Sequence, residues 1–467
     1  MTQTIATRTT PLATAADSAE NSTMSGMIEE LKETWGSMTV PELGAPNVTG
    51  LVEFKEQYQG MGRRNGEREA EARASLPADT KVISMGGGMP EHALLPMEEI
   101  SKYIKVAWEK NFPSPLEYGS SSLLKTGICD YLERTRGVPV APDELVISTG
   151  NQGGIKLVCD AYLGPNDVAI VESPLWTSTV TIVKATGADV AAVGMDDEGI
   201  DLDEIEEQIH LATGAGKHVR MIYLQPLFHN PTGITISKAR AEALLELAAK
   251  HKIVVVCDEA YEAYLYSGTP TYLSALSGGY GVLTIHTFSK TLGTGLRLGY
   301  VHSAPEMLAP IRATSLTQAS VMIEYGIGEL MADGKFDTIV ERARSAYGHK
   351  LDVFCDALEA SAGKHITVNK SDGGFFVWMQ MNELSAEEVQ LKMMGKGVLA
   401  GVGENFFGPG KHDGGKNGEE HGGHIRLAFI GASAEELVEA AARIGAACDE
   451  VAAELEVEAV VEATARL

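Results

Sequence analysis

Cysteine is scarce in this sequence. The chain of 467 residues holds five cysteines, none of them in a CxxC pair, and they are widely spaced: Cys129, Cys159, Cys257, Cys355 and Cys448. Zinc centres and disulfide frameworks need closely and regularly spaced cysteines. The spacing therefore argues against both and predicts a reduced, cytoplasmic protein whose cysteines are unpaired and mostly buried.

Long hydrophobic runs and basic charge are lacking too. No apolar stretch approaches the roughly 18 residues of a membrane-spanning helix, and the N-terminal stretch lacks the apolar core of a secretory signal. Lysine and arginine number 38 against 64 aspartates and glutamates, which gives a net charge of −26. Nucleic-acid-binding domains usually carry a basic face. We therefore expect neither a membrane nor a nucleic-acid partner.

The middle of the chain alternates between short β-rich runs and helical patterns. Apolar residues recur at helical spacing over residues 155–162 and 237–252, and Ser237 is a plausible N-cap. The β-rich runs are ELVIST, DVAIVES, VRMIYLQ, KIVVVCDEAY and VLTIHTF. This alternation is typical of an α/β domain with a mostly parallel sheet. Ligands bind at the carboxyl ends of strands in such sheets, so the loops after these runs should carry the chemistry.

Three of these loops carry groups that could bind a ligand. The small residues of TGNQGG, residues 149–154, would expose backbone N–H groups to a phosphate, although a plain tight turn is the alternative. Trp176 could stack on a planar ligand or be an ordinary core residue. Asn230 begins NPTG and could donate to an oxygen on a bound ring, or the motif could simply form a turn.

Asp258 follows five apolar residues at the end of a run that should be buried. A buried carboxylate is costly unless it is paired, and the protonated ring nitrogen of a heteroaromatic cofactor would pair it. Capping of the following helix is the alternative. Tyr261 lies three residues further on and could reach the same ligand.

The stretch HTFSKTLGTGLRLGY, residues 286–300, holds one lysine between hydroxyl-bearing neighbours. An amine that is desolvated and near other cations has a lowered pKa and can attack an aldehyde, which suits Lys290. Arg297 offers the fork of donors that fits a phosphate. Thr287 and Ser289 add hydroxyl groups.

These loops together offer a phosphate cradle, a flat aromatic side chain, an asparagine, a buried acid, a lysine and an arginine. Pyridoxal 5'-phosphate combines a phosphate, a planar ring with an oxygen, a pyridine nitrogen and an aldehyde. The set therefore predicts pyridoxal 5'-phosphate as the cofactor, and no metal.

The motifs NPTG, DEAY and SK followed by GLRLG resemble those of fold type I pyridoxal-phosphate enzymes, specifically class I and II aminotransferases. GNQGG and FSKTLGTGLRLGY are most similar to the branch of 2-aminoadipate and kynurenine aminotransferases. The resemblance covers about residue 81 to the C-terminus. It implies a three-layer α/β/α large domain over 116–345, a smaller α+β domain formed by 81–115 and 346–467, and a homodimer with shared active sites. Residues 1–80 are expected to be a partly helical or disordered extension.

The resemblance also implies roles for single residues. Lys290 forms the Schiff base with the aldehyde and moves a proton at the substrate Cα, while Asp258 keeps the ring nitrogen protonated. The remaining contacts are Asn230 and Tyr261 at the ring oxygen, Trp176 on the ring face, Asn151, Gln152, Thr287, Ser289 and Arg297 at the phosphate, Tyr118 at the phosphate of the neighbouring subunit, and Arg426, with Gly87 and Asn230 nearby, at the substrate carboxylate.

The implied reaction moves an amino group between an L-amino acid and a 2-oxo acid by a ping-pong mechanism. Trp176 stands where the family usually has tyrosine or phenylalanine, and His229 precedes NPTG. A non-transaminating enzyme (a lyase, a gamma-substituting or a C–C bond-forming enzyme) on the same scaffold therefore stays an alternative. A transcription regulator with an aminotransferase-like domain is disfavoured, because residues 1–80 lack a basic helix-turn-helix.

Two polar segments lie outside this scheme. The loop HDGGKNGEEHGGH could bind a metal, although a surface loop is favoured; its candidate ligands are His412, Asp413, His421 and His424. Arg63, Arg64 and Arg68 could belong to a lid that binds a distal substrate carboxylate.

Overall fold

The computed structural model describes residues 79–315, 318–408 and 423–465, together with residues 26, 28–33, 35, 67, 70, 71, 74, 76 and 77. Most of the expected N-terminal extension, Arg63, Arg64 and Arg68 included, lies outside the described residues. So do His412, Asp413 and His421. Among the described residues, no helix has both the length and the apolar character needed to cross a membrane.

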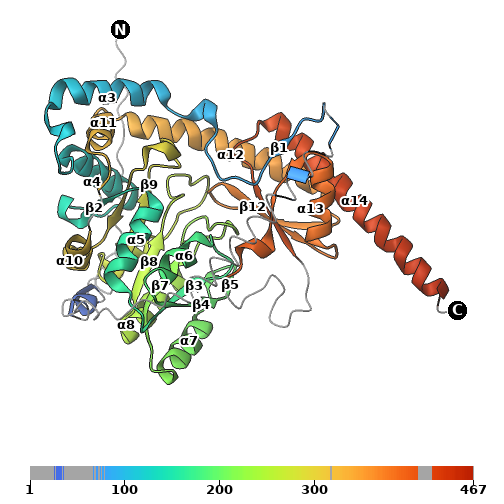
Figure 1. The fold of residues 1–467 in the computed structure, drawn as a ribbon, viewed down its shortest axis with the longest axis horizontal. Helices are drawn as coiled ribbons and strands as arrows, with labels where there is room; N and C mark the ends of the chain where they lie inside the picture. Colours follow the sequence, from blue (N-terminus) through green and yellow to red (C-terminus); the bar gives the residue numbers. More distant parts are fainter. Residues whose placement is uncertain are drawn as a thin grey trace, which may run out of the picture.

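A seven-stranded sheet forms the centre of the larger lobe (Figure 1). Its antiparallel member, β10, pairs with β2 and β9, and the other neighbours pair in parallel. The strand order is β2 (Leu145–Ser148), β10 (Gly299–His302), β9 (Val282–Thr287), β8 (Val254–Asp258), β7 (His218–Leu224), β3 (Asp167–Glu172) and β4 (Asp189–Val193). The mostly parallel sheet predicted from the sequence is confirmed.

Helices cover both faces of this sheet, because successive side chains of each strand point to opposite sides. Val254 and Val256 of β8 pack in one apolar cluster with α5 (Asn151–Tyr162), α6 (Ser178–Lys184) and α10 (Pro305–Thr314). Val255 and Cys257 pack in the other with α7 (Leu202–Gly214), α8 (Lys238–His251) and α9 (Leu273–Ser277). The result is the expected three-layer arrangement.

The local sequence signals for two of these helices are confirmed. In α5 the predicted stripe of Ile155, Val158, Cys159 and Tyr162 is buried. The Ser237 hydroxyl caps α8 by accepting a hydrogen bond from the Arg240 backbone N–H at 3.1 Å. All five cysteines are free and buried, as their spacing predicted.

The second lobe holds a four-stranded antiparallel sheet with helices packed on it (Figure 1). Its order is β11 (Ile366–Asn369), β12 (Phe376–Met381), β15 (His424–Ala428) and β14 (Gly401–Val402), and its helices are α12 (Lys335–Ala362), α13 (Ala386–Gly395) and α14 (Ala434–Ala465). Strand β1 (Ile83–Ser84) pairs in parallel with β13 (Val398–Leu399) in a separate two-stranded sheet. The domain boundaries predicted from the sequence stay a prediction.

The remaining elements connect the two lobes or lie at their edges. They are η1 (His92–Leu94), α3 (Met97–Asn111), η2 (Ser114–Leu116), α4 (Ser122–Arg136), η3 (Pro142–Glu144), β5 (Met195–Asp196), β6 (Gly199–Ile200), η4 (Thr294–Leu296), α11 (Val321–Ala332) and η5 (Gly403–Phe406).

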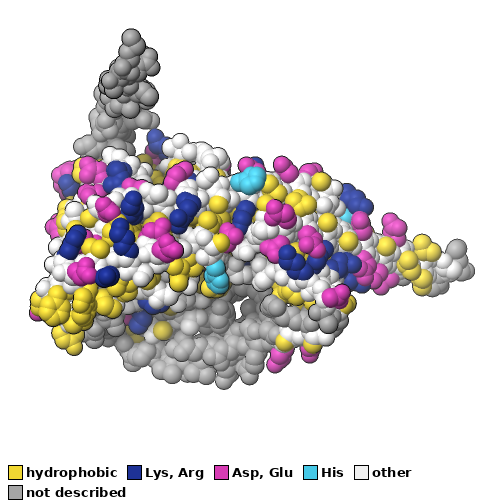
Figure 2. Space-filling model, turned by 90° about the horizontal axis from the view of Figure 1, so that it is seen from above, with side chains coloured by type: hydrophobic (Ala, Val, Ile, Leu, Met, Phe, Trp, Pro, Cys, Tyr) yellow, Lys and Arg dark blue, Asp and Glu magenta, His cyan; other side chains and the backbone are white. Residues whose placement is uncertain are grey.

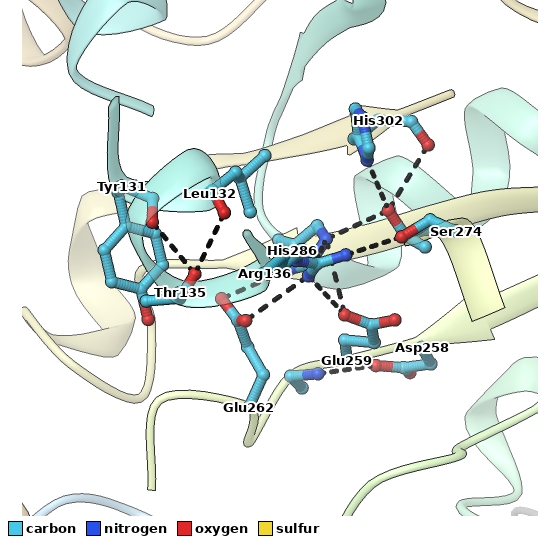
Figure 3. Close-up of polar contacts among 12 residues, drawn as sticks. Tyr131, Leu132, Thr135, Arg136, Asp258, Glu259, Glu262, Ser274, His286 and His302 are labelled. Atoms are coloured by element: carbon cyan, nitrogen blue, oxygen red, sulfur yellow. Dashed lines mark hydrogen bonds and ion pairs between the residues drawn. The ribbon is translucent and has the colours of Figure 1, made fainter. Parts of the chain in front are cut away.

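A buried ion cluster supports the end of β8. The guanidinium of Arg136, at the end of α4, contacts the carboxylates of Glu259 and Glu262 and donates to the Ser274 hydroxyl at 2.8 Å (Figure 3). His286 approaches both carboxylates, at 3.8 and 3.5 Å. Glu259, Glu262 and His286 are close enough together to hold a metal ion, but Arg136 already supplies positive charge among them. Glu259 points into this cluster, whereas the side chain of its neighbour Asp258 points to the opposite side of the sheet.

Replacing Arg136 with methionine should lower the free energy of unfolding by about 3–5 kcal/mol, because it leaves buried carboxylates without their cation. Chemical denaturation measures this change. The control is Arg134→Met on the same helix, since Arg134 makes an exposed ion pair with Asp337 at 2.7 Å. That variant should change stability little. Equal losses in both variants would contradict the assigned role of the cluster.

Candidate active site

A cavity of about 390 Å³ lies where β2, β3, β7, β8 and β9 end, and residues of the second lobe complete its wall. The carboxyl ends of parallel strands meet at one edge of a sheet, so residues far apart in the chain come together there. The predicted site residues that line it are Gly87, Asn151, Gln152, Trp176, Asn230, Asp258, Tyr261, Thr287, Ser289, Lys290, Arg297 and Arg426. Tyr118 is the exception, because it is fully exposed to solvent in this single chain.

Asp258 is the last residue of β8 and is almost completely buried. Its Oδ2 accepts hydrogen bonds from Asn151 Nδ2 at 2.6 Å, the Tyr223 hydroxyl at 2.6 Å and Gln225 Nε2 at 3.2 Å. Its Oδ1 accepts from the Ala260 backbone N–H at 3.2 Å. Such donors offset part of the cost of burying a carboxylate. The Asn151 side chain thus contacts Asp258, a partner that the expected phosphate role did not foresee.

The other end of the cavity is rich in hydrogen-bond donors. The first N–H groups of α5 lack partners within the helix, as at any helix N-terminus. Arg297 Nη2 donates to the Thr149 carbonyl at 3.0 Å. Gly150 precedes α5 with a φ of 79°, and a Cβ at this position would lie 3.2 Å from Arg297 Nη2. Any larger residue would therefore crowd this cradle, which has the donors and positive charge that a phosphate requires.

Two hydroxyl groups lie beside the cradle. Thr287 Oγ1 donates to Ser289 Oγ at 2.9 Å and accepts from the Ser289 backbone N–H at 3.0 Å. With its oxygen accepting from Thr287, the Ser289 hydroxyl can donate its own proton to a ligand in the cavity. The residue types and their placement fit a bound phosphate.

Lys290 extends from the loop after β9, and its Nζ donates to the Gly88 carbonyl at 2.8 Å. Burial and, to a smaller extent, the positive charge of Arg426 lower its pKa from 10.5 to about 8, against the opposing effect of Asp258. About a tenth of this amine is therefore unprotonated at pH 7, far more than for an ordinary lysine. An unprotonated amine is the form that attacks an aldehyde.

Arg426 is contributed by β15 of the second lobe and is buried. Its Nη1 donates to Asn230 Oδ1 at 2.9 Å, and Nη2 donates to the Gly86 carbonyl. Phe376 and Phe406 lie on the guanidinium at 4.4 and 4.5 Å. Its Nε has no hydrogen-bond partner among the described residues, so a donor remains for a ligand carboxylate.

Tyr261 and Trp176 line the cavity. Tyr261 is buried, and desolvation holds the pKa of its hydroxyl above the usual value, with Asn230 as a hydrogen-bond partner. Trp176 is 40% exposed, which shows that the alternative interpretation as a core residue is wrong.

Sequence reasoning missed several residues of this site, and four of them make the contacts described above. Gln225 follows the VRMIYLQ run directly, so the strand-end rule that selected Asp258 could have found it. Tyr223 looks like an ordinary strand residue, and nothing in the sequence marks Phe376 or Phe406 as partners of Arg426.

Comparison with known proteins matches the model of the family "Aminotransferase class I and II" to residues 80–444. Aromatic-amino-acid aminotransferase 1 of Thermococcus litoralis is 28% identical over 377 residues, which cover 78% of this chain and 89% of that protein.

Two solved structures share the fold. The multiple substrate aminotransferase from Thermococcus profundus has a TM-score of 0.72 at 25% identity, covering 82% of this chain and 95% of that one. The alpha-aminoadipate aminotransferase from Thermus thermophilus, complexed with N-(5'-phosphopyridoxyl)-L-leucine, has a TM-score of 0.68 at 26% identity, covering 80% and 93%.

The family match extends over both lobes and contains every motif on which the resemblance was based. The predicted family and the fold type I architecture are confirmed, and with them a pyridoxal-phosphate-dependent aminotransferase activity. This chain belongs to the aminotransferase class I and II family.

Proposed function

We propose that the chain transfers an amino group between an L-amino acid and a 2-oxo acid in a ping-pong reaction at the cavity that holds Lys290. The observation that carries the proposal is the shared cavity of Lys290, Asp258 and Arg426. An amine with a lowered pKa, a buried carboxylate and a buried guanidinium are the groups that an amino-acid substrate and a pyridine cofactor require.

The residues present fit pyridoxal 5'-phosphate. The α5 N-terminus, Ser289 and Arg297 would hold the phosphate, Asp258 the ring nitrogen, and Asn230 and Tyr261 the ring oxygen. Trp176 would cover the ring face. When bound, the cofactor supplies an aldehyde that accepts the amino group and a ring that withdraws electrons from the substrate Cα.

The residues of the chain then divide the work. Arg426 binds the substrate carboxylate with the paired donors of its guanidinium, and Phe376 and Phe406 shield that ion pair from water. Lys290 Nζ would take the proton from the substrate Cα and deliver it to the C4′ carbon of the cofactor, a task for which a pKa of about 8 suits an amine near neutral pH. Asp258 supplies the negative charge that balances a protonated ring nitrogen.

A second copy of the chain would complete the site. Large hydrophobic side chains are exposed at the C-terminal end of α3 and just beyond it: Trp108, Phe112, Leu116 and Tyr118. This segment lies at the left end of Figure 1, and hydrophobic side chains gather at the same end in Figure 2. Covering them in a homodimer would bring Tyr118 to the partner's phosphate site, which accounts for its full exposure in one chain.

The reaction type can be tested by giving the cofactor-loaded enzyme a panel of L-amino acids without any 2-oxo acid. Each accepted amino acid should yield 2-oxo acid only up to the amount of bound cofactor, and added 2-oxo acid should restart turnover. Mass spectrometry of the products measures this. Continuous product release without acceptor would instead establish a lyase, and Lys290→Ala should be inactive with an unchanged circular dichroism spectrum.

The rate at which the cofactor-free chain captures pyridoxal 5'-phosphate should rise with pH and level off above about 8. Below that pH Lys290 is mostly protonated and unreactive, and above it the amine is mostly free. Arg426→Gln removes a charge that lowers the Lys290 pKa, so its midpoint should move to higher pH. Visible absorption of the captured cofactor gives the rate, with Arg134→Gln as the control. A capture rate that does not change with pH in this range would refute the assignment of Lys290 as the reacting amine.

Tyr118→Phe should weaken pyridoxal 5'-phosphate binding about ten-fold, because one hydrogen bond to a charged group is lost. Fluorescence titration of the cofactor-free chain measures the dissociation constant. Tyr280→Phe, on the turn after α9, is the matched control. An unchanged dissociation constant for the Tyr118 variant would argue against a shared site.

A further inference from the structure

Gln225 follows β7 and hydrogen bonds to three parts of the site. Its backbone N–H donates to Glu172 Oε2 at 2.6 Å. Its side-chain Nε2 donates to Asp258 Oδ2 at 3.2 Å, and its Oε1 accepts from the Asn230 backbone N–H at 2.8 Å. It is buried and also lines the cavity.

The orientation of this amide follows from its partners. A backbone N–H can only donate, so the atom that faces Asn230 must be the oxygen Oε1. The NH₂ group is then left to face Asp258, whose carboxylate can only accept. Neither hydrogen bond could form if the amide were rotated by 180°. A donor on one side and an acceptor on the other therefore fix the orientation of the Gln225 amide.

Burial disfavours the charged forms of the two groups behind Gln225. Burial raises the pKa of Glu172 to about 8, while it lowers the pKa of His229 to about 3. The two side chains lie 3.4 Å apart, and His229 Nδ1 also lies 2.8 Å from the Thr232 hydroxyl. Gln225 stands between Asp258 and the Glu172–His229 pair.

We infer that Gln225 is a positioning residue for the cofactor ring, which ties the carboxylate assigned to the ring nitrogen to the segment that carries Asn230. Asp258 and Asn230 come from different segments of the chain, and Gln225 contacts both. It thereby sets the spacing between the ring-nitrogen and ring-oxygen contacts and supplies a donor that stabilises the negative charge. The inference rests on the proposed function, because it concerns the same cofactor.

Other titratable groups also act on this carboxylate. Tyr223 donates to it, and Lys290 and Tyr261 interact with it electrostatically across the cavity. Glu172 interacts with it from β3 and Cys257 from the adjacent position. These five groups remain when Gln225 is replaced, so a change seen on replacement comes from the amide itself.

Two variants of similar size test the inference. Gln225→Glu places a carboxylate oxygen against Asp258, and Gln225→Met removes the donor and the acceptor together. Both variants should raise the pKa of the titratable groups of the site. Gln225→Glu adds negative charge near the cofactor, and Gln225→Met removes a donor that stabilises the negative charge already there. The pH midpoint of the absorption change of the bound cofactor, measured without substrate, should rise by about one unit for Gln225→Glu and by less for Gln225→Met.

A merely structural role would lower the thermal midpoint of the cofactor-free chain and leave the pH midpoint of the spectrum unchanged, which would overturn the inference. Gln208→Glu and Gln208→Met, on α7, control for the chemistry of the substitutions and should not move that midpoint. If the larger changes prevent folding, Gln225→Asn keeps an amide that is too short to reach both partners and should raise the midpoint as well. A wild-type chain that binds no pyridoxal 5'-phosphate would refute the proposed function itself, whereas a wild-type midpoint shared by all Gln225 variants would refute only this inference.

Discussion

The negative charge of Asp258 is the constraint on which the rest of the site depends. A carboxylate buried at the end of a central strand is stable only if donors surround it. Here the donors come from the start of α5, from β7 and the residue directly after it, and from the backbone just after β8. Two strands of the sheet and a helix that covers it therefore hold these donors. The cofactor cavity therefore keeps its shape only while those elements keep their places.

Much of this arrangement could be predicted because the carboxyl ends of parallel strands lie at the same edge of the sheet. Asp258 and Thr287 end β8 and β9, and Lys290 follows β9 by three residues, so topology alone brings them together. The same rule applies to Gln225, which follows β7 directly. A polar residue that closes an apolar run thus carries information even when it is not titratable.

Other parts of the site have no local signal in the sequence. Arg426 reaches the cavity from the second lobe, and Phe376 and Phe406 flank it through contacts that depend on how β12, β14 and β15 pair. The side-chain contact of Asn151 with Asp258 depends on the distance between α5 and β8. Such contacts depend on packing between elements, which periodicity and motif spacing do not describe.

Asp258 and Glu259 are neighbours in the chain, yet one faces the cavity and the other an internal cation. Successive side chains along a strand point to opposite sides, so the two acids at the end of β8 face different surroundings. Deleting a single residue within β8 would bring Glu259 to the place of Asp258 at the cavity, Asp258 to the place of Cys257 on the opposite face, and Ala260 to the place of Glu259. The cavity would receive an acid that is longer by one methylene, and Arg136 would lose one of its carboxylate partners. Length changes during evolution should therefore be tolerated in the loops around β8 and rejected inside the strand.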